Sequence, residues 1–238
     1  MTQSTRPTVS AVIPGVWHAD LAGAAPPGGG GVRHAATLAD LCAVFEPEVQ
    51  VCVHPRPSHP GLAAALRGPG LRSWRGLRAS LQLGGPRGRG LAALDLPPVA
   101  GPGALREELA FLIELYGDLL GCPAVGLRIE CLERAMCPLW HVDRTGIRLL
   151  CTWRGPGTEW LDDPGVDRAS LAGGAVGHAP SGCAAPFDIV LLKGSAWQGN
   201  AGGGAIHRSP AVSAGSGPRV LVALDALWED DPPRRLRG

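Results

Sequence analysis

The sequence has almost no lysine, no long apolar run and no strong excess of charge, and these absences exclude several classes of protein. Its 238 residues carry a formal net charge of +1, and Lys193 is the only lysine. A chain with so little net charge does not attract nucleic acid or anionic membranes over its whole surface. No apolar segment approaches the roughly 20 residues that a membrane-spanning helix needs. We therefore expect no membrane association and no nucleic-acid partner.

The cysteines do not form a recognisable framework. There are seven, an odd number, and no Cys-x-x-Cys pair occurs among them. Residues 1–31 also lack the charged segment followed by an apolar segment that a secretory signal would show. Unpaired cysteines without an export signal are typical of reduced thiols. The sequence therefore predicts a cytoplasmic protein without disulfides.

Glycine and proline are abundant, at 35 and 23 residues, which argues against an all-helical bundle. Residues 1–35 are rich in Gly, Pro, Ala and Ser and contain a run of glycines, so we predict a flexible leader there. We interpret residues 36–238 as a single domain. Residues 36–123 form its helical or mixed support, and residues 124–229 form its β-rich core.

Apolar spacing predicts two helices in the N-terminal part. A short one begins near Thr37 as its cap, and a longer one with a wide apolar stripe covers residues 104–120. Between them, residues 49–53 alternate in the manner of a strand. Residues 56–103 show no clear pattern. We interpret their arginine-rich part, residues 67–89, as a solvated face, with a docking surface for an acidic partner as the alternative.

After residue 124 the hydrophobic period changes to two, which indicates strands. The expected strands cover residues 125–131, 147–153, 188–192, 205–209 and 219–224. Short strands separated by Gly- and Pro-rich turns favour a sandwich or a barrel. We therefore predict an α+β fold in which N-terminal helices pack against an antiparallel β-barrel.

A His-x-Asp pattern occurs twice, and its context selects the second copy. His18 and Asp20 lie in the predicted leader, which offers no rigid support for a metal ligand. His141 and Asp143 lie at the end of a β segment or just beyond it, and residues i and i+2 of a strand point to the same face. His207, at the start of a later strand, supplies a third ligand if the barrel brings it opposite them.

Two histidines and one carboxylate form the facial triad that suits Fe(II) in oxygenases, with open positions for a cosubstrate and dioxygen. An oxygenase that uses a 2-oxo acid also needs a cation for the distant carboxylate. Arg219 is the candidate, with a structural salt bridge to Asp225 as its alternative role. Arg208 and Lys193 are weaker candidates. Arg208 directly follows His207, so in a strand it would point to the opposite side.

The order of these residues resembles the 2-oxoglutarate- and Fe(II)-dependent oxygenase superfamily. There, His-x-Asp follows an early strand of a double-stranded β-helix, and the distal His and a basic residue come on late strands. By pattern, the match covers roughly residues 125–225. It departs from some of these oxygenases in one respect, because Arg219 does not begin an Arg-x-Ser pair.

Residues 37–228 more closely resemble an uncharacterised bacterial family known only as a domain of unknown function. The segments that carry this resemblance are H-V-D-R-T-G-I-R-L-L-C-T-W-R-G-P-G-T-E-W-L, L-K-G-S-A-W, A-I-H-R-S-P and P-R-V-L-V-A-L-D. Together the two resemblances imply a jelly-roll or cupin-like barrel, a double-stranded β-helix, with N-terminal helices packed against it.

Two functions follow as hypotheses. The first is an Fe(II)-dependent dioxygenase that uses 2-oxoglutarate to hydroxylate an unknown small-molecule or protein substrate. In it Arg148, Thr152 and Trp153 line the cavity. The second is a non-catalytic, zinc-handling protein on the same barrel, to which Cys137 adds a thiolate, because thiolate and imidazole ligands suit zinc.

Overall fold

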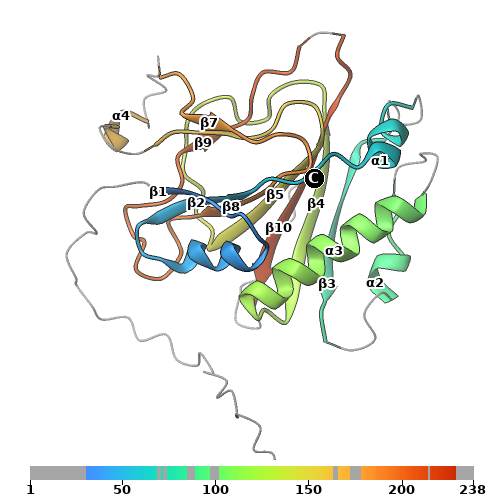
Figure 1. Cartoon of the computed structure of the whole chain (residues 1–238), viewed down its shortest axis with the longest axis horizontal. Coiled ribbons are helices and arrows are strands. Elements are labelled where there is room, and N and C mark those ends of the chain that lie inside the picture. Colours follow the sequence, from blue (N-terminus) through green and yellow to red (C-terminus); the bar gives the residue numbers. More distant parts are fainter. Residues whose placement is uncertain are drawn as a thin grey trace, which may run out of the picture.

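Two β-sheets and one long helix form the part of the chain that the computed structural model describes (Figure 1). It describes residues 31–68, 71, 74–84, 89–96, 102–162, 166–171, 178–213 and 215–228. The strands are β1 (Gly31–His34), β2 (Val49–His54), β3 (Gly76–Gln82), β4 (Ala124–Leu132), β5 (Ile147–Arg154), β6 (Glu159–Trp160), β7 (Gly182–Cys183), β8 (Ile189–Lys193), β9 (His207–Arg208) and β10 (Arg219–Leu227). The helices are η1 (Ala39–Phe45), α1 (Pro60–Ala65), α2 (Arg89–Ala92), α3 (Pro102–Leu120) and α4 (Arg168–Leu171).

The strand order explains how distant segments meet. The large sheet has the order β1-β2-β8-β5-β10-β4-β3, and the small sheet has the order β7-β6-β9. Strands β1 and β2 are parallel, and the other pairs are antiparallel. The last strand, β10, lies between β5 and β4, so the C-terminal segment is central to the large sheet. The observed fold is thus a mixed α+β arrangement of a seven-stranded sheet and a small sheet.

Helix α3 covers part of one face of the large sheet, on the side of β4 and β10 (Figure 1). Its apolar stripe is fully buried at Leu105, Leu109 and Leu112, and it packs against alternate residues of β4, β5 and β10. Each such leucine contributes about 1.5–3 kcal/mol through burial. The hydroxyl of Tyr116 donates a hydrogen bond to the carbonyl oxygen of Ile147 at 2.6 Å, which fixes the start of β5 on the helix.

The other face of the large sheet packs against the small sheet. Its apolar cluster combines Leu150 of β5 and Leu221 of β10 with Trp160 of β6 and Ala205 before β9. Because successive side chains of a strand point to opposite faces, Leu149 packs with α3 whereas Leu150 points to this inner face. The inner face is therefore enclosed between the two sheets.

Most of the expected elements are confirmed, whereas the short elements β6, α4 and β7 and several elements of the N-terminal half were not expected. The helix expected over residues 104–120 is α3, and the five strands expected after residue 124 are β4, β5, β8, β9 and β10. Thr37 does not cap a helix with its side chain: η1 follows Leu38 without a side-chain cap, and the Thr37 amide instead donates to Asp40. The segment of residues 56–103, which had no clear pattern, contains α1, α2 and strand β3.

The predicted leader lies mostly outside the described residues, and so do His18 and Asp20. Its last part, Gly31–His34, is strand β1, which pairs with β2. All seven cysteines are free. Within the described ranges, no helix combines the length and the apolar character that crossing a membrane requires.

We expect the substitution Leu109→Ala to lower the free energy of unfolding by about 2–5 kcal/mol, because it leaves a cavity between α3 and the large sheet. Urea denaturation measures this loss. The matched control Glu107→Ala changes an exposed residue of the same helix and should alter stability by less than about 0.5 kcal/mol. Equal stability of the two variants would contradict the packing of α3 on the sheet.

Candidate metal centre

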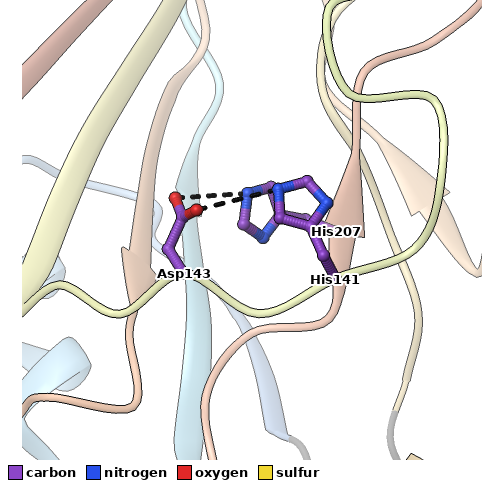
Figure 2. Close-up of side chains that lie close together, drawn as sticks. All are labelled: His141, Asp143 and His207. Atoms are coloured by element: carbon purple, nitrogen blue, oxygen red, sulfur yellow. Dashed lines mark ion pairs between the residues drawn. The ribbon is translucent and has the colours of Figure 1, made fainter. Parts of the chain in front are cut away.

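His141, Asp143 and His207 lie together beside the inner face (Figure 2). One potential ligand atom from each residue lies within 4.8 Å of the others. The Nε2 atom of His141 is 3.7 Å from Asp143 Oδ1, and the Nε2 atom of His207 is 3.5 Å from Asp143 Oδ2. Among the described residues, no other cluster of histidine, cysteine and carboxylate side chains has this geometry. The sequence prediction of these three residues as one group is consistent with their positions.

Backbone pairing brings the two histidines together. His141 and His207 form an isolated antiparallel bridge, in which each amide donates to the other residue's carbonyl oxygen at 3.0 Å. His207 is also the first residue of β9 and pairs with Trp160 of β6. The ring centroids of the two histidines are 4.4 Å apart as a result.

Hydrogen bonds to the backbone set the tautomer of both imidazoles. Nδ1 of His141 lies 2.9 Å from the carbonyl oxygen of Leu139, and Nδ1 of His207 lies 3.0 Å from that of Ala205. A carbonyl oxygen only accepts, so Nδ1 carries the proton in each neutral ring. The lone pair of each Nε2 is then directed toward Asp143. Such backbone contacts are the usual outer support of metal-binding histidines.

The charge state of the group also suits a cation. Burial, and then the neighbouring His207, lowers the pKa of His141, which favours the neutral imidazole. Burial opposes the ionisation of Asp143, but the charge of Arg148 beside it holds the pKa of Asp143 well below its usual range. Three electron-pair donors that face one another repel unless a cation lies between them. The residues present therefore fit a divalent metal ion.

The loop between β8 and β9 supports the backbone of Asp143. The amide of Ser195 donates to the carbonyl oxygen of Asp143 at 2.9 Å. A Cβ atom at Gly194 would lie only 2.2 Å from the carbonyl oxygen of Thr145, so this close approach requires glycine. The loop is fixed further on by Asn200, whose side-chain amide donates to Gln50 Oε1 at 3.0 Å. None of these supports was apparent in the sequence.

Arg219 lies on the inner face, and 1% of it is exposed. Its Nε donates to the carbonyl oxygen of Pro156 at 2.7 Å, and its Nη2 lies 3.2 Å from the hydroxyl oxygens of Thr152 and Thr158. Its Nη1 has no hydrogen-bond partner among the described residues. Burial lowers the pKa of Arg219 to about 10. The salt bridge considered with Asp225 is absent, because Asp225 binds Arg148 instead.

Arg208 and Lys193, the weaker candidates for a cosubstrate anchor, already have partners. Arg208 Nε pairs with Glu159 Oε2 at 2.6 Å, and its guanidinium lies over the ring of Trp140 at 4.2 Å. Lys193 Nζ donates to the carbonyl oxygen of Glu46 at 2.6 Å. Because both side chains already have these partners, neither is well placed to bind the carboxylate of a cosubstrate.

The three residues expected to line the cavity divide between the two faces of the sheet. Thr152 and Arg148 contact inner-face groups, namely Arg219 and Asp143. Trp153 packs in the cluster with α3, so its predicted place in the cavity is wrong. The physical reason is the alternation of side chains along β5, which places neighbours of Thr152 on the opposite face. Cys137, considered as a zinc ligand, is not part of the ligand group.

A pocket of about 310 Å³ opens beside His141. It is lined by Trp140, His141, Val142, Arg168, Leu171, Ser195, Gly202 and Gly203. The volume lies at the lower end of the range for small-molecule sites. His141 therefore borders a space that a small molecule can enter.

A family model described as "Protein of unknown function (DUF1826)" matches residues 35–225. No curated protein matches the sequence.

Solved structures add a likeness of fold. Dioxygenase for auxin oxidation 1 from Arabidopsis thaliana, in complex with 2-oxoglutarate, is 12% identical, and the match covers 84% of this chain and 93% of that chain with a TM-score of 0.50. The rice dioxygenase for auxin oxidation is 17% identical, with 88% of each chain covered and a TM-score of 0.47. A full-length Neurospora crassa protein, in complex with alpha-KG, is 12% identical, with 79% of this chain and 78% of that chain covered and a TM-score of 0.40. At these identities the first likeness shows a shared fold and no residue roles.

We expect His207→Ala to weaken Co(II) binding by more than about 100-fold. Changes in residues that only support a metal ligand typically lower metal affinity about 10- to 100-fold, and removal of a ligand itself should lower it further. Titration of the metal-free protein, followed by visible absorption, measures the affinity. His178→Ala is the matched control, because His178 is exposed and lies outside the ligand group. The assignment of the centre is refuted if the two variants bind Co(II) equally well.

Proposed function

The chain belongs to the DUF1826 family of proteins of unknown function, and we propose that it is a non-haem Fe(II) oxygenase that uses 2-oxoglutarate as its cosubstrate. One observation carries the proposal: a ligand group of two histidines and one aspartate shares the inner face with a buried arginine that lacks a carboxylate partner among the described residues. The two histidines and the aspartate can hold the metal, and the arginine can bind a dianionic cosubstrate.

The donor set supports iron over structural zinc. Two imidazoles and one carboxylate suit Fe(II) and leave coordination positions open, whereas structural zinc sites are closed and rich in thiolates. His141 Nε2, His207 Nε2 and an oxygen of Asp143 would hold the ion. When bound, the iron supplies the redox chemistry that activates dioxygen for attack on the substrate.

Arg219 supports a carboxylate ligand on the inner face. A buried guanidinium without a counter-ion is costly, and an anion that reaches its unpaired Nη1 removes much of that cost. The hydroxyls of Thr152 and Thr158 hold Nη2 and can also donate to a carboxylate oxygen. Thr158 immediately precedes β6, and β6 pairs with the strand of His207, so Arg219 of the large sheet contacts the small sheet next to the strand that carries this ligand. Arg219 would thus orient the distal carboxylate of the cosubstrate.

The fold supports the same proposal in a weaker way. Two sheets that enclose an inner face are consistent with a double-stranded β-helix, and the Arabidopsis enzyme of similar fold was solved with 2-oxoglutarate. The pocket beside His141 has the size of a small-molecule site. We therefore propose a small molecule as the substrate, oxidised next to this imidazole.

The protein should release succinate from 2-oxoglutarate when Fe(II) and dioxygen are present, even without its substrate. It is purified without oxygen and supplied with Fe(II) and 2-oxoglutarate, and succinate is measured after air is admitted. Asp143→Ala should release none. Tight zinc binding by the wild-type protein without any succinate would instead favour the zinc-handling protein.

We expect Arg219→Met to weaken the binding of 2-oxoglutarate about tenfold or more, because a hydrogen-bonded charge contact contributes about 1.5–3 kcal/mol. Its Co(II) affinity should stay close to that of the wild-type protein. Isothermal titration of the metal-loaded protein measures the cosubstrate affinity, and thermal unfolding checks the fold.

Two further variants make this test specific. Arg78→Met changes an arginine of β3 that is paired with Glu130 of β4. It should leave the cosubstrate affinity unchanged. Arg208→Met tests the alternative anchor. Loss of 2-oxoglutarate binding in Arg208→Met, with normal binding in Arg219→Met, would show that the anchor is assigned to the wrong arginine.

A further inference from the structure

We propose that Arg148, held by Asp225, is a positioning residue that determines which oxygen of Asp143 faces the metal. The inference rests on the proposed function to the extent that the centre must bind a divalent metal ion. Arg148 is largely buried, with 14% of its side chain exposed, and it lies between the carboxylates of Asp143 and Asp225. It therefore connects a metal ligand to β10, in the interior of the large sheet.

Asp225 fixes the plane of the guanidinium. Arg148 Nε donates to Asp225 Oδ1 at 2.8 Å, and Nη2 donates to Oδ2 at 2.9 Å. Such a two-point contact sets both the position and the rotation of an arginine. The two residues are direct partners across β5 and β10, so the register of the sheet holds them opposite each other. Arg128 of β4 approaches the same carboxylate, with its Nη2 3.5 Å from Asp225 Oδ2.

Because Nε and Nη2 of Arg148 bind Asp225, the orientation of Nη1 is fixed as well. Its Nη1 donates to Oδ2 of Asp143. Oδ1 of Asp143 has no arginine contact among the described residues and lies 3.7 Å from Nε2 of His141. Oδ2 also lies 3.5 Å from Nε2 of His207, but it already accepts the hydrogen bond from the guanidinium of Arg148. Asp143 is thereby held ready to offer Oδ1 to the ion.

Coordination through a single oxygen matters for the proposed chemistry. A triad of three ligand atoms leaves three positions of an octahedral ion open, whereas a carboxylate bound through both oxygens leaves fewer. A lysine could not replace Arg148, because one ammonium cannot fork to Asp225 and also reach Asp143. The pair of Arg148 and Asp225 would therefore preserve the space that a cosubstrate and dioxygen require.

The test compares three variants of the full chain by Co(II) titration and by the Co(II) absorption spectrum, which reports the coordination of the ion. Arg148→Gln removes the contact with Asp143. Asp225→Asn leaves Asp143 untouched and loosens only the arginine that holds it. Arg128→Gln is the matched control, because Arg128 shares Asp225 but does not contact Asp143.

We expect Arg148→Gln and Asp225→Asn to weaken Co(II) binding by about 10-fold or more, as changes in supporting residues typically do, and to change the spectrum in the same way. Arg128→Gln should retain the wild-type affinity and spectrum. If Arg148→Gln does not fold, as judged by circular dichroism, Arg148→Lys takes its place with the same expectation.

The outcomes separate this inference from the proposed function. If the wild-type protein binds Co(II) and both variants match it in affinity and spectrum, the positioning role is refuted while the metal centre stands. If Arg128→Gln causes the same changes as Arg148→Gln, the effect is one of general charge, and the inference also fails. If the wild-type protein binds no divalent metal, the proposed function fails first.

Discussion

The candidate centre depends on the backbone bridge between His141 and His207. Two hydrogen bonds of 3.0 Å hold these residues side by side, although one follows an early strand of the β-rich half and the other begins a late one. On its other side His207 pairs with β6, so the small sheet and the loop that carries Asp143 meet at this residue. Because both Nδ1 atoms are held by carbonyl oxygens, the bridge also directs both Nε2 atoms to one point. The backbone therefore sets the positions of both imidazoles of the candidate centre.

The buried charges of the inner face fall into two kinds. Asp225 is balanced by Arg148 and Arg128, and Arg148 also balances Asp143, so these charges stabilise one another. Arg219 is more deeply buried, yet only neutral oxygens hold it within the described part of the chain. An uncompensated buried charge costs stability, so its presence indicates a function more strongly than a paired charge does. The contrast between these paired charges and Arg219 supports the proposal that Arg219 binds an anion.

The sequence was sufficient to select three side chains that lie together in the fold, and to predict most of the β-rich half, because the strands depend on local patterns. Alternating apolar residues placed β4, β5 and β10. Relations across the sheet could not be predicted in the same way. The sequence suggested Asp225 as an alternative partner of Arg219, but it could not show that Asp225 pairs with Arg148 of the neighbouring strand. Strand β3 was missed because residues 56–103 combine turn-forming residues with arginines and show no clear period.

A crystal structure of the protein, grown without oxygen and soaked with Mn(II) and 2-oxoglutarate, tests the central claim most directly. Mn(II) substitutes for Fe(II) at oxygen and nitrogen ligands and is identified by its anomalous scattering. The account predicts one Mn(II) peak within bonding distance of His141 Nε2, His207 Nε2 and one oxygen of Asp143, with the distal carboxylate of 2-oxoglutarate on Arg219. A metal bound elsewhere, or a cosubstrate that leaves Arg219 without an anion, would contradict it.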